Sequence, residues 1–400
     1  MKFSSRIQHI PVSQTLVIEA RAKELKSQGA DIISFTVGEP DFDTPSHIKD
    51  AAIEAIKSGF TKYTAAEGIP ELRKAITEQI NRELQPAIPY EWSQTMVSNG
   101  SKQAIYNFFQ VVLEKGDEVI IPAPYWLSFP PIVELAGGKP KIVKTTYGEG
   151  FKLTPEKLKK ALTRKTKVLV INSPSNPTGA TYTEAELKKL LPILEKHPVW
   201  IVSDEAYYKL IYDGLVFSSL ASLSKKLLPR IAIFRTCSKS YAMTGWRIGS
   251  VTGAKALISA MTIVQSQATS SVNSISQKAA FSAVSEVQSE QGIKAMVKEF
   301  DRRRCRGLEL LSEIPEIECF RPEGAFYFFV NVRKYYKRKY KGVSIQNSAA
   351  LSTFLLDHAN VAVIPGDAFG ADDYIRLSFA TSIEKIETGI QRIKSALALL

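Results

Sequence analysis

Continuous apolar runs most constrain the fold of this chain. Residues 168–171 read Val-Leu-Val-Ile, residues 200–202 read Trp-Ile-Val, and residues 231–235 form a third run. Such strands are typically buried on both faces, as in parallel sheets covered by helices. A helix is predicted over 184–196, between the first two runs. The pattern predicts an α/β fold, in which ligands gather at the carboxyl ends of the strands.

The length of 400 residues indicates more than one structural unit. We expect a large domain over 48–285, with a mostly parallel sheet flanked by helices, and a smaller α+β domain over 286–400. The segment 1–47 is expected to pack with the smaller domain, which would bring Gly38 near Arg376. Further strands are predicted at 32–37, 95–97, 118–121, 248–252, 325–332, 361–364 and 374–379. Further helices are predicted at 15–28, 45–58 with Thr44 as N-cap and Pro45 as first residue, from 70, at 103–113, 277–312, 347–359 and from 382.

The charge balance is basic, with a net charge of +12 and a pI near 9.3. The charges are spread along the chain, and the densest patches, 302–306 and 333–341, lack the context of known RNA or DNA modules. We therefore expect no nucleic-acid partner. A site for an anionic cofactor and an anionic substrate fits the same sign of charge.

Targeting and metal signals are absent from the sequence. Neither a signal peptide nor an apolar run of membrane-spanning length is found, and the three cysteines show no metal spacing. We expect a cytoplasmic protein with reduced thiols, no membrane partner and no metal. Cys237, beside Lys239, is interpreted as a packed small residue.

Lys239 is the first candidate catalytic residue. It stands between Ser238 and Ser240, with Arg247 eight residues further on. A desolvated lysine amine forms a Schiff base with a carbonyl, and hydroxyls with a guanidinium bind a phosphate ester. Together they suggest pyridoxal 5′-phosphate (PLP). A lone Ser-Lys-Ser motif is more often a loop with a solvated lysine, so other residues have to support this interpretation.

Three other positions have unusual chemistry for their context. Asp204 follows a buried strand and must be paired, either with a protonated pyridine nitrogen or within a helix cap or salt bridge. Arg376 lies in an apolar strand and requires a carboxylate, internal or from a substrate. Residues 98–102, between a strand and a helix, form a possible anion site, since bare N–H groups and the positive end of the helix dipole meet there.

Three more side chains could reach a flat cofactor ring. Asn176 lies in a turn with two prolines that can hold its amide against a phenolic oxygen, and Tyr207 follows three residues after Asp204. Trp126 could stack on the ring, although a core position is the commoner explanation for a tryptophan.

These motifs together resemble a known family. They occur in the order and approximate spacing of fold type I PLP-dependent class I/II aminotransferases, and look most like the bacterial aspartate (and aspartate/prephenate) subgroup. The resemblance covers essentially the whole chain. It rests on Gly-Glu-Pro-Asp-Phe-Asp-Thr-Pro at 38–45, Lys62-Tyr63, 68–73, Pro124-Tyr125-Trp126, Ser-Asn-Pro-Thr-Gly at 175–179, Asp204 with Tyr207, Ser238-Lys239, Gly-Trp-Arg-Ile-Gly at 245–249, and Arg376.

The resemblance implies a role for each matching residue. Lys239, Asp204 and Tyr207 would be catalytic, with Lys239 forming the internal aldimine and then moving the proton between substrate and cofactor. The implied cofactor contacts come from several loops: Tyr63, Gly100, Ser101, Lys102, Trp126, Asn176, Asp204, Tyr207, Thr236, Ser238, Lys239 and Arg247. The implied substrate contacts are Ser13, Gly38, Lys102, Trp126, Asn176 and Arg376. Tyr63 would reach the phosphate of a neighbouring subunit, which implies a homodimer.

The expected activity is ping-pong transamination between aspartate or glutamate and 2-oxo acids. In the bacterial subgroup a lysine, here Lys102, would bind the distal carboxylate, with Ser13 assisting. Glu67 would oppose a dicarboxylate if it faced the pocket. The alternatives are an aromatic amino acid or prephenate aminotransferase, a carbon–sulfur lyase of the same fold, and a non-enzymatic PLP-sensing regulator, although the sequence leaves no room for the DNA-binding domain of such a regulator.

Overall fold

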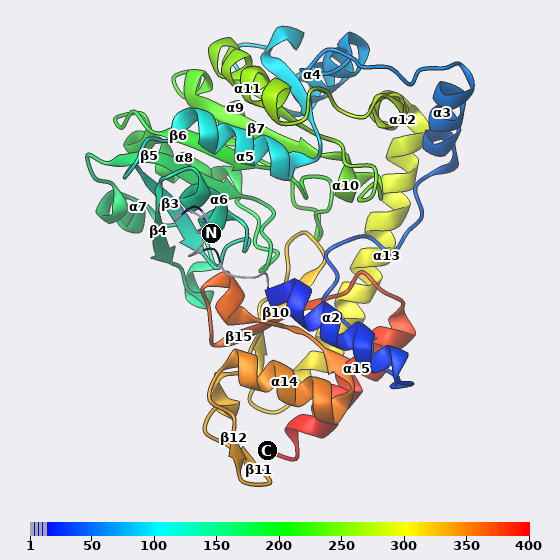
Figure 1. The fold of residues 1–400 in the computed structure, drawn as a ribbon. Helices are drawn as coiled ribbons and strands as arrows, with labels where there is room; N and C mark the ends of the chain where they lie inside the picture. Colours follow the sequence, from blue (N-terminus) through cyan, green and yellow to red (C-terminus); the bar gives the residue numbers. More distant parts are fainter. Residues whose placement is uncertain (1–3, 5–6, 8–9, 11–13) are drawn as a thin grey trace.

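A seven-stranded sheet forms the larger half of the molecule (Figure 1). The computed structural model describes residues 4, 7, 10 and 14–400. The order in the sheet is β2-β8-β7-β6-β5-β3-β4. Its strands are β2 Thr95–Ser98, β3 Glu118–Ala123, β4 Lys139–Lys144, β5 Thr166–Asn172, β6 Trp200–Asp204, β7 Ile231–Thr236 and β8 Gly249–Thr252.

The direction of these strands confirms the predicted mostly parallel sheet. β7, β6, β5, β3 and β4 pair in parallel, and β8 alone runs antiparallel to both of its neighbours, β2 and β7. The edge strand β4 was not predicted, because its sequence Lys-Pro-Lys-Ile-Val-Lys alternates and is mostly exposed or half-exposed. A strand with one exposed face has an alternating sequence, whereas the central strands were identified by continuous apolar runs.

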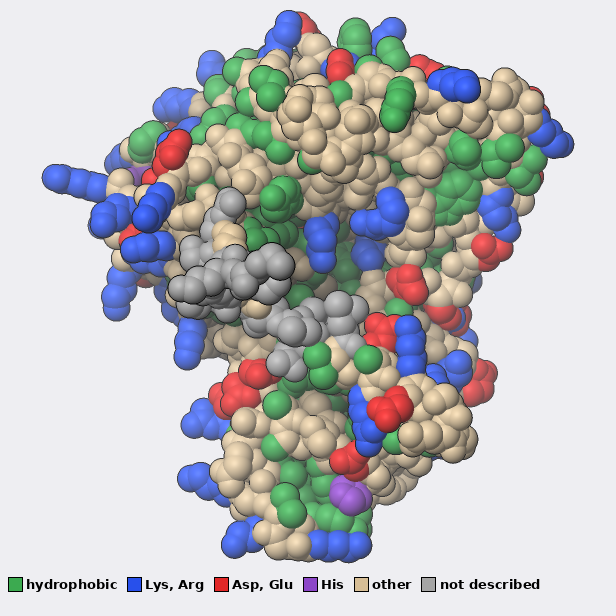
Figure 2. All heavy atoms as spheres, viewed as in Figure 1, with side chains coloured by type: hydrophobic (Ala, Val, Ile, Leu, Met, Phe, Trp, Pro, Cys, Tyr) green, Lys and Arg blue, Asp and Glu red, His purple; other side chains and the backbone are tan. Residues whose placement is uncertain are grey.

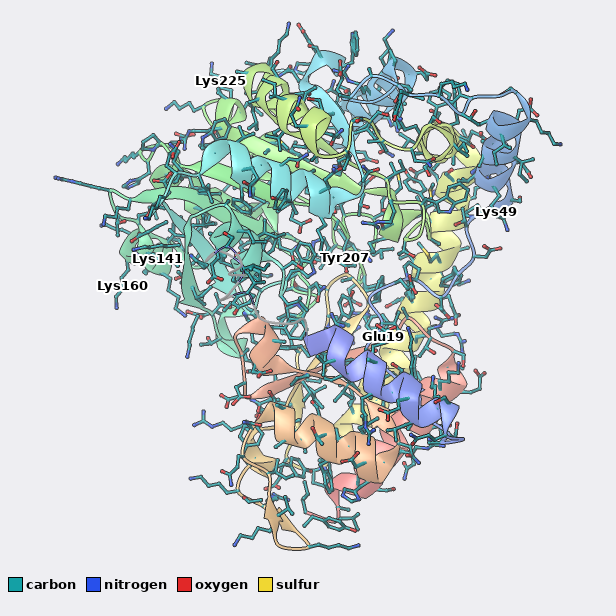
Figure 3. All side chains as sticks on the ribbon, in the orientation of Figure 1. Glu19, Lys49, Lys141, Lys160, Tyr207 and Lys225 are labelled. Carbon is teal, nitrogen blue, oxygen red and sulfur yellow. The ribbon has the colours of Figure 1, made fainter. Side chains whose placement is uncertain are left out.

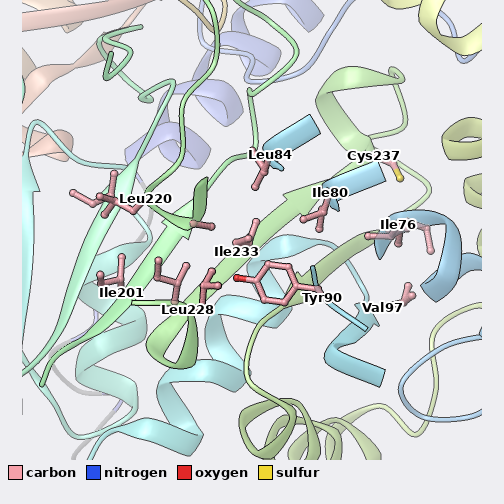
Figure 4. Close-up of a cluster of buried hydrophobic side chains, with 14 of the residues drawn as sticks. Ile76, Ile80, Leu84, Tyr90, Val97, Ile201, Leu220, Leu228, Ile233 and Cys237 are labelled. Carbon is pink, nitrogen blue, oxygen red and sulfur yellow. The ribbon is translucent and has the colours of Figure 1, made fainter. Parts of the chain in front are cut away.

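Both faces of the sheet are buried, which explains the continuous apolar runs. Leu169, Ile201 and Ile233 pack into one core cluster with helix residues such as Ile76 and Ile80 (Figure 4). Their immediate neighbours in the strands, including Val168, Val202 and Phe234, pack into a second cluster on the other face. The helices of this half are α3 Ser46–Lys57, α4 Pro70–Leu84, α5 Ser101–Val112, α6 Phe129–Leu135, α7 Pro155–Ala161, α8 Glu184–Leu194, α9 Leu220–Leu223, α10 Cys237–Ser240, α11 Lys255–Ala268 and α12 Ser274–Ser285.

The smaller half is built on an antiparallel sheet with order β14-β15-β10-β9. Its strands are β9 Glu318–Cys319, β10 Tyr327–Asn331, β14 Ile364–Pro365 and β15 Tyr374–Ser378, and β11 Lys339–Tyr340 and β12 Val343–Ser344 form a separate hairpin. Its helices are α13 Val287–Ser312, α14 Ser348–Ala359 and α15 Ile383–Leu397. Five 3₁₀ turns are described in the chain: η1 Trp92–Gln94, η2 Tyr147–Glu149, η3 Leu228–Arg230, η4 Arg333–Tyr335 and η5 Gly366–Phe369.

The N-terminal segment lies against the smaller half. Strand β1 Ile33–Ser34 pairs in parallel with β13 Val361–Ala362, and helix α2 Gln14–Ser27 contacts β13 and β14. In Figure 1, α2 lies beside α14 and α15. Residues of α2 and β1 thus contact the smaller half, while the predicted division of the chain, with boundaries at 47 and 285, stays a prediction.

The two halves meet around the segment that follows β6. Tyr207 lies between the two sheets (Figure 3) and packs with Phe326 and Tyr327 of the smaller half. Backbone bonds join Ala325 N to Leu210 O at 3.0 Å and Tyr212 N to Glu323 O at 3.0 Å. The carboxyl end of β6 is therefore held by both halves.

Several predicted boundaries were wrong for local reasons. Helix α3 begins at Ser46, since the Thr44 hydroxyl donates to Ala242 O at 2.7 Å instead of capping the helix. The expected helix 277–312 is two helices, α12 and α13, separated at Glu286 in extended conformation. Helix α5 begins at Ser101, two residues earlier than expected. Within the expected strands 32–37 and 361–364 only short stretches pair, because β1 and β13 meet over two residues.

Candidate active site

A cavity of about 400 Å³ opens where the two halves meet. It lies at the carboxyl ends of β5, β6 and β7 and at the N-terminus of α5, as expected for an α/β sheet. Figure 2 shows a hollow between the two halves with Lys or Arg side chains in it. The cavity is lined by Gly38, Ser101, Lys102, Trp126, Leu127, Ser128, Asn172, Asn176, Asp204, Ala206, Tyr207, Thr236, Ser238, Lys239, Arg247, Tyr327 and Arg376.

Lys239 projects into this cavity from α10, directly after β7. Its Nζ donates to the carbonyl oxygen of Gly38 from the N-terminal segment. Burial lowers the pKa of Lys239 to about 8; Arg247 and Arg376 add to the fall, whereas Glu39 opposes it. An amine with such a pKa is partly neutral near physiological pH, which both a nucleophile and a general base require.

Asp204 ends β6 and is 5% exposed. Its Oδ1 accepts a hydrogen bond from Ala206 N at 3.2 Å, and no cation lies within ion-pair distance in the described part of the chain. Burial raises the pKa of Asp204 to about 7. The buried salt bridge considered from sequence is thus not formed with described residues, and the carboxylate fits a cationic ligand group.

The anion end of the cavity is formed by the start of α5 and by the segment 236–249. The amides of Ser101 and Lys102 occupy the first turn of α5, where N–H groups have no intrahelical acceptor. A Cβ at Gly100, where φ is +82°, would collide with the Arg247 guanidinium, and one at Gly249 would collide with Ser101 N. Both positions therefore require glycine, which lets the guanidinium and the bare amides come together.

The hydroxyls at this end are held by α10. Thr236 caps the helix, its Oγ1 accepting from Ser238 N at 3.1 Å and lying 2.9 Å from Ser238 Oγ. Arg247 adopts the left-handed region at φ +58° and donates to Thr244 O at 2.9 Å. The backbone conformation of 236–249 thus brings the Thr236 and Ser238 hydroxyls and the Arg247 guanidinium to the same end of the cavity.

Arg376 lies at the opposite side of the cavity, in β15, and is 3% exposed. It donates to Thr36 O at 2.7 Å and to Asn176 Oδ1 at 3.0 Å, and its buried Nε has no partner among residues 4, 7, 10 and 14–400. No carboxylate pairs with it among the described residues. Of the two partners considered from sequence, an internal carboxylate is not observed, so the guanidinium fits a carboxylate brought by a ligand.

Lys102 and Trp126 line a third wall. The Lys102 Nζ lies 5.0 Å from the centre of the Trp126 ring, a cation–π distance. Burial lowers the pKa of Lys102, and the nearby Arg247 lowers it further. Trp126 packs edge-on against Phe129 at 5.2 Å and keeps part of its surface on the cavity.

Two of the predicted site residues that the structure describes do not line the cavity. Gly100 directly precedes the lining residue Ser101, and Tyr63 is 90% exposed. Glu67 pairs with Arg73 at 3.4 Å and does not line the cavity either. Ser13 lies outside the described residues.

Two lining residues of chemical interest were not predicted. Asn172 ends a buried strand in the same way as Asp204, and this position could have identified it. Tyr327 lies in the aromatic run 326–329, where nothing in the sequence distinguishes a site residue from a core residue. Cys237 is buried, and burial raises the pKa of its thiol to about 12, as expected of a packed residue.

Two features are absent from the described residues. No group of three or more His, Cys, Asp or Glu side chains is placed to hold a metal ion there. None of the described helices has the length and apolar composition needed to cross a membrane.

The fold and the cavity define a transferase of fold type I. The chain belongs to the aminotransferase class I and II family, whose sequence pattern matches residues 30–393. This finding confirms the family predicted from the motifs.

Relatives and solved structures agree over the full length. A probable aspartate/prephenate aminotransferase of Rickettsia bellii is 48% identical over 98% of both chains, and the aspartate aminotransferase of Bacillus subtilis is 44% identical over 98% of both. The crystal structure of the aspartate aminotransferase of Rhizobium meliloti superposes with a TM-score of 0.95 at 43% identity, covering 100% of this chain and 99% of that one. The Thermus thermophilus enzyme with maleate gives 0.92 at 38% identity, covering 99% and 100%.

Proposed function

We propose that this aminotransferase uses PLP and exchanges the amino group between aspartate or glutamate and 2-oxo acids. The observation that carries the proposal is the shared cavity of Lys239 and Asp204, in which a partly neutral amine lies near a buried carboxylate that lacks a cation. Family membership and the names of the relatives support the same assignment.

The donor set of the cavity fits PLP. Asp204 would pair with the protonated ring nitrogen, Asn176 and Tyr207 would bind the ring oxygen, and Trp126 would stack on the ring. The phosphate would be held at the anion end by Ser101 N, Lys102 N, Thr236, Ser238 and Arg247. When bound, PLP withdraws electrons from the substrate Cα and carries the amino group from one substrate to the next.

Two side chains would act on the substrate. Arg376 would bind its α-carboxylate by two parallel hydrogen bonds, with the Gly38 backbone and Asn176 beside it. Lys239 would take the proton from the substrate Cα at its Nζ and release it again, for which a pKa of about 8 is suitable. Donor and acceptor would use the same site in turn, which gives ping-pong kinetics.

The ammonium group of Lys102, in the cavity wall beside Trp126, favours acidic substrates. Lys102 has no carboxylate partner among the described residues, and it could bind a distal carboxylate. Glu67, whose charge would oppose such a substrate, is engaged by Arg73. The proposed assistance from Ser13 stays a prediction.

A homodimer is also part of the proposal. The Tyr63 ring is 90% exposed on the single chain, so it is accessible to a second copy of the chain. Tyr63 would then contact the phosphate in the neighbouring subunit. The mass of the native protein, measured by light scattering, tests the dimer.

The test of function is a stopped-flow half-reaction. The protein loaded with PLP is mixed separately with aspartate, glutamate, tyrosine and phenylalanine, and the visible absorbance of the bound cofactor is followed. We expect rapid loss of that absorbance with the two acidic donors, slow loss with the aromatic ones, and none with Lys239→Ala. The control is Lys209→Ala, because Lys209 is a half-buried lysine that does not line the cavity.

Other outcomes would favour the alternatives. Equal or faster conversion by aromatic donors would reject the acidic assignment. Conversion of prephenate as acceptor would match the names of the Rickettsia relatives. Release of pyruvate and ammonia without an acceptor would indicate a lyase, and a protein that never binds PLP would overturn the proposal.

A further inference from the structure

Tyr327 lies in the wall of the cavity without an assigned role. It belongs to β10, the central strand of the smaller sheet, and its side chain is 0% exposed. Tyr327 pairs in register with Ser378, and Phe329 with Arg376. Tyr327 and Arg376 are therefore diagonal neighbours on the same face of the sheet, and the guanidinium carbon lies 4.4 Å from the centre of the Tyr327 ring.

The Tyr327 hydroxyl lies where three parts of the cavity meet. Its oxygen is 2.8 Å from the hydroxyl oxygen of Tyr207. A Cβ at Gly38 would come within 3.1 Å of it, so a larger residue at position 38 would crowd the hydroxyl. The Gly38 carbonyl in turn accepts from Lys239. Tyr327 thus contacts the residues that surround both the amine and the carboxylate-binding guanidinium.

The direction of the bond between the two phenols follows from their surroundings. A cation against its ring stabilises negative charge on a phenol and makes it the better donor. Burial raises the pKa of both tyrosines, and Arg376 opposes the rise at both; the bond between the two phenols opposes the rise at Tyr327 and adds to it at Tyr207. With Tyr327 donating, the Tyr207 oxygen is the acceptor, and the Tyr207 hydrogen is free to point into the cavity.

From this geometry we propose that Tyr327 is a positioning residue that aims the Tyr207 hydroxyl at the ring oxygen of the cofactor and couples it to carboxylate binding at Arg376. The inference rests on the proposed function, which supplies the cofactor and the carboxylate. The guanidinium of Arg376 lies against the Tyr327 ring as a cation–π contact. A carboxylate that neutralises this cation therefore changes how strongly Tyr327 donates to Tyr207.

The test compares Tyr327→Phe with Tyr335→Phe. Tyr335 is a close match: it is 3% exposed, donates to Pro315 O at 2.6 Å and has the Arg338 guanidinium carbon 4.5 Å from its ring centre, but it does not line the cavity. The readout is the pH midpoint at which the visible absorbance of bound PLP changes. We expect Tyr327→Phe to raise this midpoint by about 0.5–1 pH unit and the PLP dissociation constant about 5-fold, while Tyr335→Phe matches the wild type.

A dicarboxylate probe tests the coupling. Saturating succinate should shift the midpoint of the wild type and of Tyr335→Phe, and Tyr327→Phe should lose at least half of that shift. Tyr207→Phe should raise the midpoint as well. The double variant Tyr207→Phe/Tyr327→Phe should have the same midpoint as Tyr207→Phe alone, since Tyr327 acts through Tyr207.

The outcomes separate the two proposals. A Tyr327→Phe midpoint and succinate shift equal to those of Tyr335→Phe, or additive shifts in the double variant, would overturn the role of Tyr327 and leave the proposed function intact. A wild-type protein that shows no PLP absorbance would overturn the proposed function and this inference together.

Discussion

Asp204 and Glu205 are adjacent buried carboxylates with opposite surroundings. Asp204 is the last residue of β6 and Glu205 is the next residue, and their exposed fractions are 5% and 1%. Glu205 accepts from Arg235 Nε at 3.0 Å and from the hydroxyls of Ser203 and Ser219 at 2.9 and 2.7 Å. Asp204 accepts from one backbone amide and faces the cavity.

The side of the sheet end that carries Glu205 is a closed network, which we call the rear cluster: Glu83, Glu205, Lys209, Arg235 and Glu290. In it Glu83 binds Arg235 at 2.5 Å and Lys209 at 2.7 Å, and Lys209 also binds Glu290 at 2.5 Å. Buried charges away from the cavity, such as Glu205 and Arg235, are thus paired with one another and stabilise the fold. Asp204, which lines the cavity, has no cationic partner among the described residues and is left to a ligand.

Removing the carboxylate of Asp204, which faces the cavity, should have the largest effect on activity. Asp204→Asn should lower kcat/KM at least about 10³-fold, because the proposed electrostatic partner of the PLP ring nitrogen is lost. The free energy of unfolding of the cofactor-free protein should not fall, because a buried carboxylate without a cation is unfavourable. Steady-state kinetics and urea unfolding measure both quantities. A variant that kept its activity but lost stability would place Asp204 with the paired charges.

Removing a paired charge should have the reverse effect. Arg235→Leu should destabilise the cofactor-free protein by about 3–5 kcal/mol, because Glu205 would be left buried and unpaired. Arg302→Leu is the control, since its pair with Glu299 is 56% exposed on the arginine side and should contribute less than about 1 kcal/mol. Equal effects of the two substitutions in urea unfolding would contradict the contrast.

The free energy of unfolding should vary with pH because of the raised pKa of Asp204. Its pKa is about 7 in the folded chain against an ordinary value of 3.8, so between these values the folded state holds a proton that the unfolded state releases. The free energy of unfolding should therefore fall as pH rises from about 4 to about 7, by up to about 4 kcal/mol, and level off above. Urea unfolding of cofactor-free wild type and Asp204→Asn checks this, because the difference between the two curves isolates the group. A difference that did not vary with pH would exclude the raised pKa.

The arginines allow the smallest test of the same contrast. Arg376→Lys should raise KM for the amino acid about 10–100-fold with little loss of stability, because an ammonium cannot form two parallel bonds to a carboxylate. Arg304→Lys should leave KM unchanged and lower stability, since Arg304 is 0% exposed and pairs with Asp213 and Asp301. Steady-state kinetics and thermal unfolding of the two variants suffice. A KM effect in Arg304→Lys would mean that paired arginines also serve the site.

Much of the fold could be predicted because the strongest sequence signals coincide with the deepest burial. The central strands are buried on both faces, so their apolar runs are continuous, and Pro70 and Gly59 mark helix ends by their backbone preferences alone. The two-residue strand β9 could not be predicted, and the short extent of β1 within the predicted strand 32–37 could not be either, since pairing with β10 and β13 defines them.

The site was predictable where a residue was out of place in its local pattern. Asp204 and Arg376 are charges in apolar strands, and Lys239 follows another. Tyr327 could not be found in this way, because an aromatic side chain in an aromatic run is what a core requires. The contrast between Asp204 and Glu205 also needed the structure, because only the neighbouring strand supplies Arg235.

The place of β8 in the sheet has a consequence for how the protein is made. β8 lies between β2 and β7, where Gly249 is in register with Ser98 on one side and Thr236 on the other. Strand β2, at the end of the sheet order, gains this neighbour only after about 150 further residues have been synthesised. Contacts of such long range close slowly and late in folding. The Arg247 guanidinium reaches Gly100 by the same closure, so a nascent chain that ends before β8 has the helix N-terminus but not the complete anion end. Phosphate affinity should therefore appear only once the sheet is finished, so the proposed cofactor would bind the completed sheet and not a shorter nascent chain.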